Sequence, residues 1–169
     1  MWQEIHAEDM NWDPFPRKKG NWFLVTAGRE GACNTLLGTY GGLLSLWSRN
    51  CAAVAIRESR YTKAFLDREE GFSIAVLPEA FRDAVRYCGS HSGREGDKFA
   101  AAGLTPAFAE GIPFPEEAEL VLLCRKLCAC PMEGARFAPD IHRSYYEGKW
   151  ENNPHTLYIG EIVKILRKA

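Results

Sequence analysis

The chain has 169 residues, of which 46% are hydrophobic, so it can bury a substantial core, and its length fits one domain spanning residues 1–169 better than two. Its formal net charge of −1 at pH 7 provides no long-range field, which excludes nucleic acid and acidic membranes as default partners. The largest basic cluster, residues 17–19, is too short to act as a polybasic arm.

The N-terminal segment carries Glu4, Glu8 and Asp9 and lacks the apolar region of a secretory signal, so we expect no export. The uncharged stretch at residues 31–48 is interrupted by glycines and by hydroxyl and amide side chains, which makes it unsuitable as a membrane span. We therefore expect a cytoplasmic protein.

Six cysteines lie in apolar segments, and without an export signal they are expected to be reduced and buried rather than paired in disulfides. The last three, Cys124, Cys128 and Cys130, have neither CxxC spacing nor a second pair of ligands at zinc spacing. They are interpreted as small hydrophobic residues of a strand.

Six segments have the composition of β-strands: residues 21–27, 34–38, 51–56, 72–77, 120–130 and 156–166. The run at 51–56 does not alternate, as expected for a strand covered on both faces. The last segment also fits a helix, but its β-branched residues and Gly160 favour a strand. The pair Gly41 and Gly42 permits a close approach to another group, or a simple bend.

Three helices are predicted, the first over residues 62–70 with its first residue as N-cap. The second begins at Pro78 and ends at Gly89, and its apolar residues recur at helical spacing. The third covers residues 95–102 and ends at Gly103. Because short turns join the strands, the pattern favours an antiparallel sheet or barrel over a doubly wound fold. Residues 1–17 are interpreted as an irregular segment or edge strand, and residues 104–117 as a loop or extended cover. Residues 132–153 are interpreted as a surface excursion.

Standard catalytic and nucleotide-binding motifs are absent from the sequence. Gly38, Gly41 and Gly42 lack GxGxxG spacing, residues 89–98 depart from the P-loop pattern, and no GxSxG occurs. His91 is interpreted as a loop or binding residue rather than a general base, and none of the four histidines has metal-ligand spacing in its favour.

Two groups of hydrogen-bond donors remain as site candidates. Residues 57–62 lie where a buried strand ends and a helix begins, so that arginines, hydroxyls and helix N-terminal amides can converge on a phosphate. An ordinary polar turn with solvated arginines explains the same residues equally well. Ser92 and Arg94 offer a second set of donors before the next helix. Together with the glycine- and aromatic-rich stretch at 31–48, they indicate a site for a flat, partly apolar ligand with an anionic tail.

Five segments, in order along the chain, resemble the flavin reductase-like, FMN-binding split-barrel family, in particular its flavoredoxin-type members. They are NTLLGTYGG at 34–42, RESRYT at 57–62, YCGSHSGREGDKFAAAGLTP at 87–106, CRKL at 124–127 and YIGEI at 158–162. The resemblance implies a mainly β fold with short helices: an antiparallel, Greek-key-like split β-barrel that forms a homodimer and binds FMN near the dimer interface.

The resemblance further implies that residues 34–40 border the isoalloxazine ring, that residues 57–62 hold the ribityl phosphate, and that the loop before the third helix completes the polar side. The implied FMN-binding residues are Asn34, Thr35, Leu36, Leu37, Gly38, Thr39, Tyr40, Arg57, Ser59, Arg60, Tyr61, Thr62, Ser92, Arg94 and Lys98. Leu37 stands where relatives often have threonine, and Tyr40 where they often have tryptophan, so a hydroxyl contact is in doubt while stacking can be kept.

Flavin chemistry needs no acid–base dyad, which agrees with the lack of a catalytic triad, and Thr39 and the backbone around Gly38 are candidate donors to the ring edge. The resemblance therefore implies an FMN-dependent oxidoreductase that passes hydride or electrons from NADH or NADPH to flavin or another small acceptor. The alternative is a flavoredoxin-type electron carrier with tightly bound FMN, no nicotinamide turnover and a redox-protein partner. A flavin- or haem-binding module without a redox role is the third interpretation.

Overall fold

The computed structural model describes residues 1–13 and 22–169, so the basic cluster at 17–19 and the first residue of the 21–27 segment lie outside the described residues. The described residues form ten strands: β1 (Trp2–Ile5), β2 (Phe23–Arg29), β3 (Ala32–Gly38), β4 (Gly41–Leu46), β5 (Arg49–Arg57), β6 (Gly71–Val76), β7 (Pro106–Ala109), β8 (Ile112–Pro115), β9 (Leu120–Pro131) and β10 (His155–Lys168). Their α-helices are α1 (Tyr61–Arg68), α2 (Arg82–Ser90), α3 (Lys98–Ala102) and α4 (Pro139–Tyr145), and single 3₁₀ turns cover Ala7–Asp9, Glu79–Phe81 and Gly148–Trp150.

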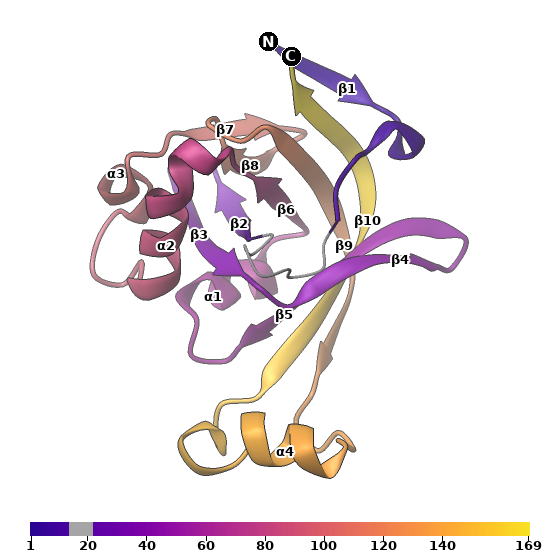
Figure 1. Ribbon diagram of the computed structural model, residues 1–169, viewed down its shortest axis with the longest axis vertical. Helices are drawn as coiled ribbons and strands as arrows, with labels where there is room; N and C mark the ends of the chain where they lie inside the picture. Colours follow the sequence, from indigo (N-terminus) through magenta and orange to yellow (C-terminus); the bar gives the residue numbers. More distant parts are fainter. Residues whose placement is uncertain (14–21) are drawn as a thin grey trace.

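Eight of these strands form one antiparallel sheet in the order β3-β2-β6-β9-β10-β5-β4, with β1 paired to the C-terminal end of β10. Figure 1 shows this sheet curling around the core, with α2 and α3 on one flank, the β4–β5 hairpin projecting on the other, and α4 in a lobe at the far end of β9 and β10. The predicted mainly β, antiparallel fold with short helices is confirmed.

The core lies inside the curled sheet. β2 buries its first six residues consecutively, as expected for a strand covered on both faces. Phe23, Phe72 and Tyr158 are each at most 1% exposed and belong to one apolar cluster, and burying a side chain of this size contributes about 1.5 to 3 kcal/mol. Gly160 makes room for this cluster, because a Cβ there would lie 2.8 Å from Phe72 Cε1 and 2.9 Å from Cys124 Cβ.

A second apolar cluster covers the outer face of the sheet. Here Ile112 and Phe114 of the β7–β8 hairpin pack with Val121 and Leu123 of β9. Residues 104–117 were expected to be a loop or extended cover, and they contain a two-stranded hairpin that covers the sheet. Its turn residues, Glu110 and Gly111, both have positive φ (52° and 74°).

All six predicted strands are confirmed with small shifts of their bounds, including β10, for which a helix had fitted nearly as well. Four strands lie outside these six segments: β1 falls in the segment interpreted as irregular or an edge strand, and β7 and β8 fall in the expected loop or extended cover. The fourth, β4, was not predicted at all; it begins at the glycine pair and forms a hairpin with β5. Its turn residues, Trp47 and Ser48, have positive φ (51° and 57°) without the Asn-Gly or Asp-Gly sequence that usually marks such a turn.

The predicted helices occur, but their starts differ from prediction. α1 begins one residue earlier, with Arg60 at the N-cap position but without a side-chain capping bond, so Thr62 is not the N-cap. A 3₁₀ turn precedes α2, which begins at Arg82 rather than at Pro78. α3 begins at Lys98 because the carboxylate of Asp97 accepts a hydrogen bond from Ala100 N at 3.1 Å.

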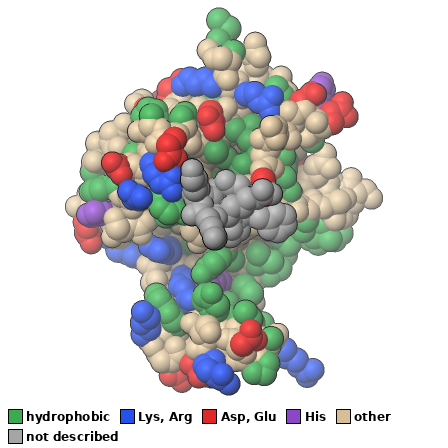
Figure 2. All heavy atoms as spheres, viewed as in Figure 1, with side chains coloured by type: hydrophobic (Ala, Val, Ile, Leu, Met, Phe, Trp, Pro, Cys, Tyr) green, Lys and Arg blue, Asp and Glu red, His purple; other side chains and the backbone are tan. Residues whose placement is uncertain are grey.

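No helix of residues 1–13 and 22–169 has both the length and the hydropathy that crossing a bilayer would require. On the face of the molecule shown in Figure 2, acidic and basic side chains lie intermixed.

Candidate functional site

A cavity of about 360 Å³ lies where β5 ends and α1 begins, and the chain from the end of α2 to the start of α3 forms its opposite wall. It brings together eight of the sequence-predicted residues with four others; the lining is Leu36, Arg57, Ser59, Arg60, Tyr61, Thr62, Ser90, His91, Ser92, Glu95, Lys98 and Trp150. The two predicted donor sets therefore face each other across one space.

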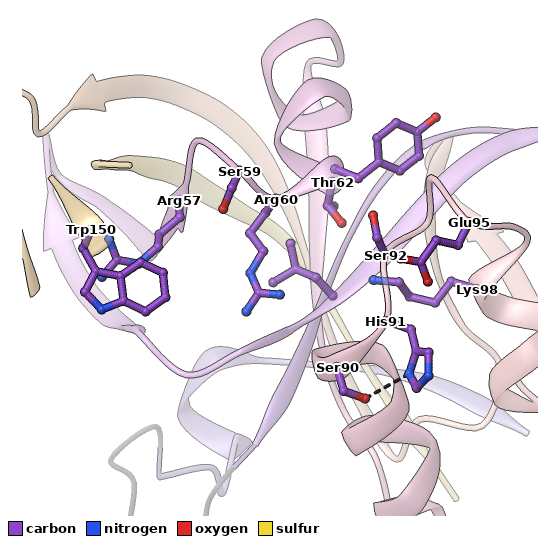
Figure 3. A pocket seen from close by; sticks show the side chains of 12 residues that line it. Arg57, Ser59, Arg60, Thr62, Ser90, His91, Ser92, Glu95, Lys98 and Trp150 are labelled. Carbon is purple, nitrogen blue, oxygen red and sulfur yellow. Dashed lines mark hydrogen bonds between the residues drawn. The ribbon is translucent and has the colours of Figure 1, made fainter. Parts of the chain in front are cut away.

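Two cations dominate the electrostatics of this cavity. Figure 3 shows the guanidinium of Arg60 and the amine of Lys98 entering the space between the α1 turn and the α2–α3 segment. Lys98 is only 6% exposed, and its Nζ donates to the carbonyl of Cys88 at 3.1 Å. Burial lowers the pKa of Lys98, and the positive charge of Arg60 lowers it further. The arrangement favours an anionic ligand, which would stabilise both cations.

The start of α1 adds neutral donors to this wall. The first N–H groups of an α-helix have no intrahelical partner and attract anions. Ser59 and Ser92 place hydroxyl groups beside the same space. Glu95 also lines the cavity and raises the pKa of Lys98, which opposes part of the effect of burial.

Asn34 holds the walls in register without lining the cavity. It is 4% exposed, and its Nδ2 donates to Thr62 Oγ1 at 2.8 Å, which ties β3 to α1. A Cβ at Gly93 would lie 2.3 Å from Asn34 Oδ1, so the loop after α2 packs directly on this amide. Arg94 donates to the carbonyl of Ser59 at 3.1 Å and lies over the ring of Tyr61, joining the same loop to the turn before α1.

A smaller cavity of about 70 Å³ adjoins the first and shares Leu36, Arg57 and Arg60 with it. Its other lining residues are Leu37, Gly38, Thr39, Tyr40, Ala55, Ile56 and His155. Thr39 and Tyr40 are exposed, so this second cavity opens to solvent on their side. Thr35 alone among residues 34–40 is fully enclosed in the core, where it accepts from Thr26 Oγ1 at 2.9 Å and donates to the carbonyl of Val25.

Sequence reasoning missed the contribution of residues 132–153, which were interpreted only as a surface excursion. Arg57 donates to the carbonyls of Asn153 at 2.6 Å and Tyr145 at 3.0 Å, and its guanidinium stacks over Trp150 at 4.2 Å. Asn153 also accepts from Ser59 N and donates to Ser59 Oγ, at 3.0 and 2.9 Å. The segment thus shapes the turn before α1, and its aromatic composition was the only signal of this role in the sequence.

Arg57 is consequently placed differently from the other predicted phosphate ligands. Its two terminal nitrogens are bonded to backbone carbonyls, while Arg60 makes one such bond, to Gly89 at 3.2 Å. Arg60 and Lys98 are therefore the cations that face the cavity with donors to spare.

The histidine at the base of the smaller cavity is held neutral. His155 is 5% exposed; burial is the main cause that lowers its pKa from 6.5 to about 4, and the charge of Arg57 adds to it. Its Nδ1 shares a hydrogen bond with Tyr146 Oη at 2.9 Å, and its ring meets Tyr40 edge-on. His91, by contrast, is exposed, stacks on Tyr87 and shares a hydrogen bond with Ser90 at the rim of the larger cavity.

No group of three or more histidine, cysteine or acidic side chains in the described part of the chain is arranged to hold a metal ion. Cys51, Cys88 and Cys124 are buried as predicted, whereas Cys33, Cys128 and Cys130 are only partly buried, which corrects the expectation for these three. All six are free thiols.

Comparison with known proteins identifies the class of protein that this fold and site define. The family model described as the flavin reductase-like domain matches residues 19–169. The chain belongs to this family. A search of curated proteins returned no match.

Solved structures agree in fold. The chain is similar to the FMN-binding domain of a flavin reductases-like enzyme from Shewanella baltica OS155 (TM-score 0.69, 17% identity, 99% of this chain and 77% of that one). It is also similar to flavoredoxin from Methanosarcina acetivorans (0.68, 18%, 96% and 76%) and to an NADH:FAD oxidoreductase from Streptomyces globisporus (0.63, 19%, 88% and 75%). At these identities the likeness establishes the fold.

The lowered pKa of His155 predicts a pH dependence of stability. In the unfolded chain the imidazole returns to a pKa near 6.5, so between pH 6.5 and about 4 the unfolded state binds more protons than the folded state. The free energy of unfolding should therefore fall as the pH decreases through this window, by up to about 3 kcal/mol.

Urea unfolding measured across this pH range, with His155→Gln as the non-titrating reference, tests the prediction. The wild type should lose stability relative to the variant as the pH falls. Parallel pH curves for the two proteins would show that the imidazole titrates normally in the folded state.

Proposed function

We propose that the chain is an FMN-dependent oxidoreductase, which takes hydride or electrons from NADH or NADPH and passes them to flavin or another small acceptor. The observation that supports this most is the pairing of two unlike cavities. One holds the buried amine of Lys98; the other, directly beside it, shares Leu36, Arg57 and Arg60 with the first and adds the uncharged residues 37–40. A flat ring with an anionic tail matches this sequence of environments.

The larger cavity fits the phosphate of FMN. Lys98 and Arg60 supply charge, Ser59 and Ser92 supply hydroxyl donors, and the first amides of α1 supply neutral ones. Tyr61 and Thr62 belong to the same wall, while Arg94 and Asn34 keep the two sides of the cavity together. The lining supports this separation of roles: Lys98, Arg60, Ser59 and Ser92 line the space, whereas Asn34 and Arg94 do not line it and bond other parts of the protein.

The smaller cavity fits one edge of the isoalloxazine ring. Leu36 and Leu37 offer apolar contact and exclude water, Thr39 offers a hydroxyl, and the backbone near Gly38 offers an amide. The ring of Phe23 occupies the position that a side chain at residue 38 would take, since a Cβ there would lie 2.2 Å from it. A ligand can therefore approach Gly38 only from another direction. The neutral imidazole of His155 adds no charge to this edge.

When bound, FMN supplies the hydride and electron chemistry itself, and the protein supplies binding, orientation and tuning of the ring. In this proposal Thr39 and the backbone at Gly38 donate to the ring edge, and the neighbouring leucines keep water from it. The exposure of Thr39 and Tyr40 leaves room for a nicotinamide or an acceptor to approach from solvent.

The second candidate is a flavoredoxin-type electron carrier with tightly bound FMN and no nicotinamide turnover. Its support is the depth of the phosphate site: a ligand that neutralises an ammonium as buried as that of Lys98 should dissociate slowly.

In both cases we propose a single cytoplasmic domain over residues 1–169, and the free thiols fit a reducing compartment.

We further propose that the protein is a homodimer in which the β4–β5 hairpin contacts a second copy. The hairpin projects from the sheet (Figure 1), and it exposes Leu43 and Trp47, which are 37% and 56% accessible. Exposed apolar side chains on a projecting element favour burial in an interface.

The visible spectrum during anaerobic reduction tests the proposed activity. The full chain purified with added FMN should retain the yellow flavin, and NADH or NADPH should bleach it fast enough to account for catalytic turnover. The Lys98→Met variant should retain less FMN than the wild type. A protein that does not bind FMN would contradict the proposal as a whole. Retained FMN that neither nicotinamide bleaches would favour the electron carrier instead.

Light scattering of the full chain tests the dimer. We expect twice the mass of the chain for the wild type and a shift towards the monomer for a Leu43→Ser, Trp47→Ser double variant. Phe108→Ser removes an exposed aromatic side chain of β7 and should leave the mass unchanged. A wild-type monomer, or equal shifts in both variants, would rule out the hairpin interface.

A further inference from the structure

Two thiols lie together on β9, outside the proposed FMN site. Cys128 and Cys130 are alternate residues of this strand, so their side chains point to the same face. Their sulfur atoms are 3.0 Å apart, and each residue is partly exposed. Because a disulfide has an S–S distance of about 2.05 Å, the two sulfurs need to approach by roughly 1 Å to form one.

The strand can adjust at this point. β6 pairs with β9 only as far as Arg125, and in the described residues β9 beyond this position is paired on one side, with β10. The register with β10 shifts between Lys126 and Cys128, which leaves Leu127 without a cross-strand partner. Such irregularities bend a strand and increase its twist. A strongly twisted strand has a shorter rise per residue, which would bring nearby alternate residues closer together.

We propose that Cys128 and Cys130 form a reversible dithiol–disulfide pair that exchanges with low-molecular-mass disulfides of the glutathione class. One cysteine thiolate attacks a sulfur of the small disulfide, whose S–S bond breaks and releases one thiol. The second cysteine then attacks the mixed disulfide and releases the other thiol. The cysteine pair loses two electrons and two protons, and the small disulfide is reduced to two thiols.

The geometry of the strand makes the oxidised state easy to reduce. Alternate residues of a strand are separated by roughly 6.4 to 6.8 Å between Cα atoms, the upper end of the range that disulfides span. Strained and exposed disulfides are the readily reduced ones, which suits reversible rather than structural oxidation. The hydrogen bond shared with Cys128, and to a lesser extent burial, raise the pKa of Cys130, so exchange should accelerate as the pH rises.

The position of the pair connects it to the walls of the cavity. From Cys130 the chain continues through Pro131 into residues 132–153, where Asn153 and Tyr145 bond to Arg57. Cys130 also lies opposite Leu157 of β10, which lies opposite Ala55 of β5 in the lining of the smaller cavity. Oxidation would therefore alter the strand at the base of the segment that shapes the site.

Peptide mass analysis after exposure to glutathione disulfide tests the proposal without added FMN. Trypsin cleaves after Lys126 and Arg136, so one peptide, residues 127–136, contains this pair and no other cysteine. In the reduced full chain treated with glutathione disulfide, this peptide should lose the mass of two hydrogen atoms, and reduced glutathione should restore it. Cys128→Ser and Cys130→Ser should each carry one glutathione instead.

Cys33 provides the internal control, because it is also partly buried and lies alone in the tryptic peptide of residues 30–49. That peptide can gain glutathione but cannot lose two hydrogens. A wild-type 127–136 peptide that keeps both thiols, retains glutathione, or is linked to another peptide would overturn the proposal. So would a pair that reduced glutathione does not restore.

Discussion

The proposed site depends on the position of one ammonium group, that of Lys98. Burial of a charge costs free energy unless the charge is compensated, and Lys98 is 6% exposed. The ammonium of Lys98 has three N–H donors, one of which donates to the carbonyl of Cys88 in the last turn of α2. The partial negative charge at that end of the helix also favours the cation. An anion in the adjoining cavity would engage the remaining donors, which supports the proposed ligand of opposite charge.

The rest of the fold keeps that cavity open and its walls in register. β5 delivers the turn before α1, and the hydrogen bond from Asn34 to Thr62 joins this helix to β3. Gly93 allows the loop after α2 to close on the same amide. Residues 132–153 reach the turn from the other side through Asn153, so four segments distant in sequence share one site. None of them alone forms an anion site.

The sequence predicted the strands well because their apolar runs are set by burial on one or both faces, as in β2 and β5. It did not predict β4, since the turn at Trp47 and Ser48 has no recognisable turn sequence. Of the fifteen candidate site residues, those at 57–62 with Ser92 and Arg94 were already indicated by donor patterns in the sequence, and the others came from the family resemblance. The structure separates their roles: Asn34 and Thr35 are bonded inside the protein, whereas Arg60 and Lys98 face the cavity. The bonds of Arg57 could not be predicted, because its partners lie 88 and 96 residues away.

The affinities of FMN and riboflavin, which differ only by the phosphate, test the central claim most directly. The wild type should bind FMN more tightly, and Arg60→Ala should weaken FMN binding by about 1.5 to 3 kcal/mol while leaving riboflavin binding nearly unchanged. Lys98→Met should act in the same direction, and Arg29→Ala, at the exposed β2–β3 turn, should change neither affinity. Equal losses for FMN and riboflavin in Arg60→Ala and Lys98→Met, or no loss, would contradict a phosphate site in this cavity.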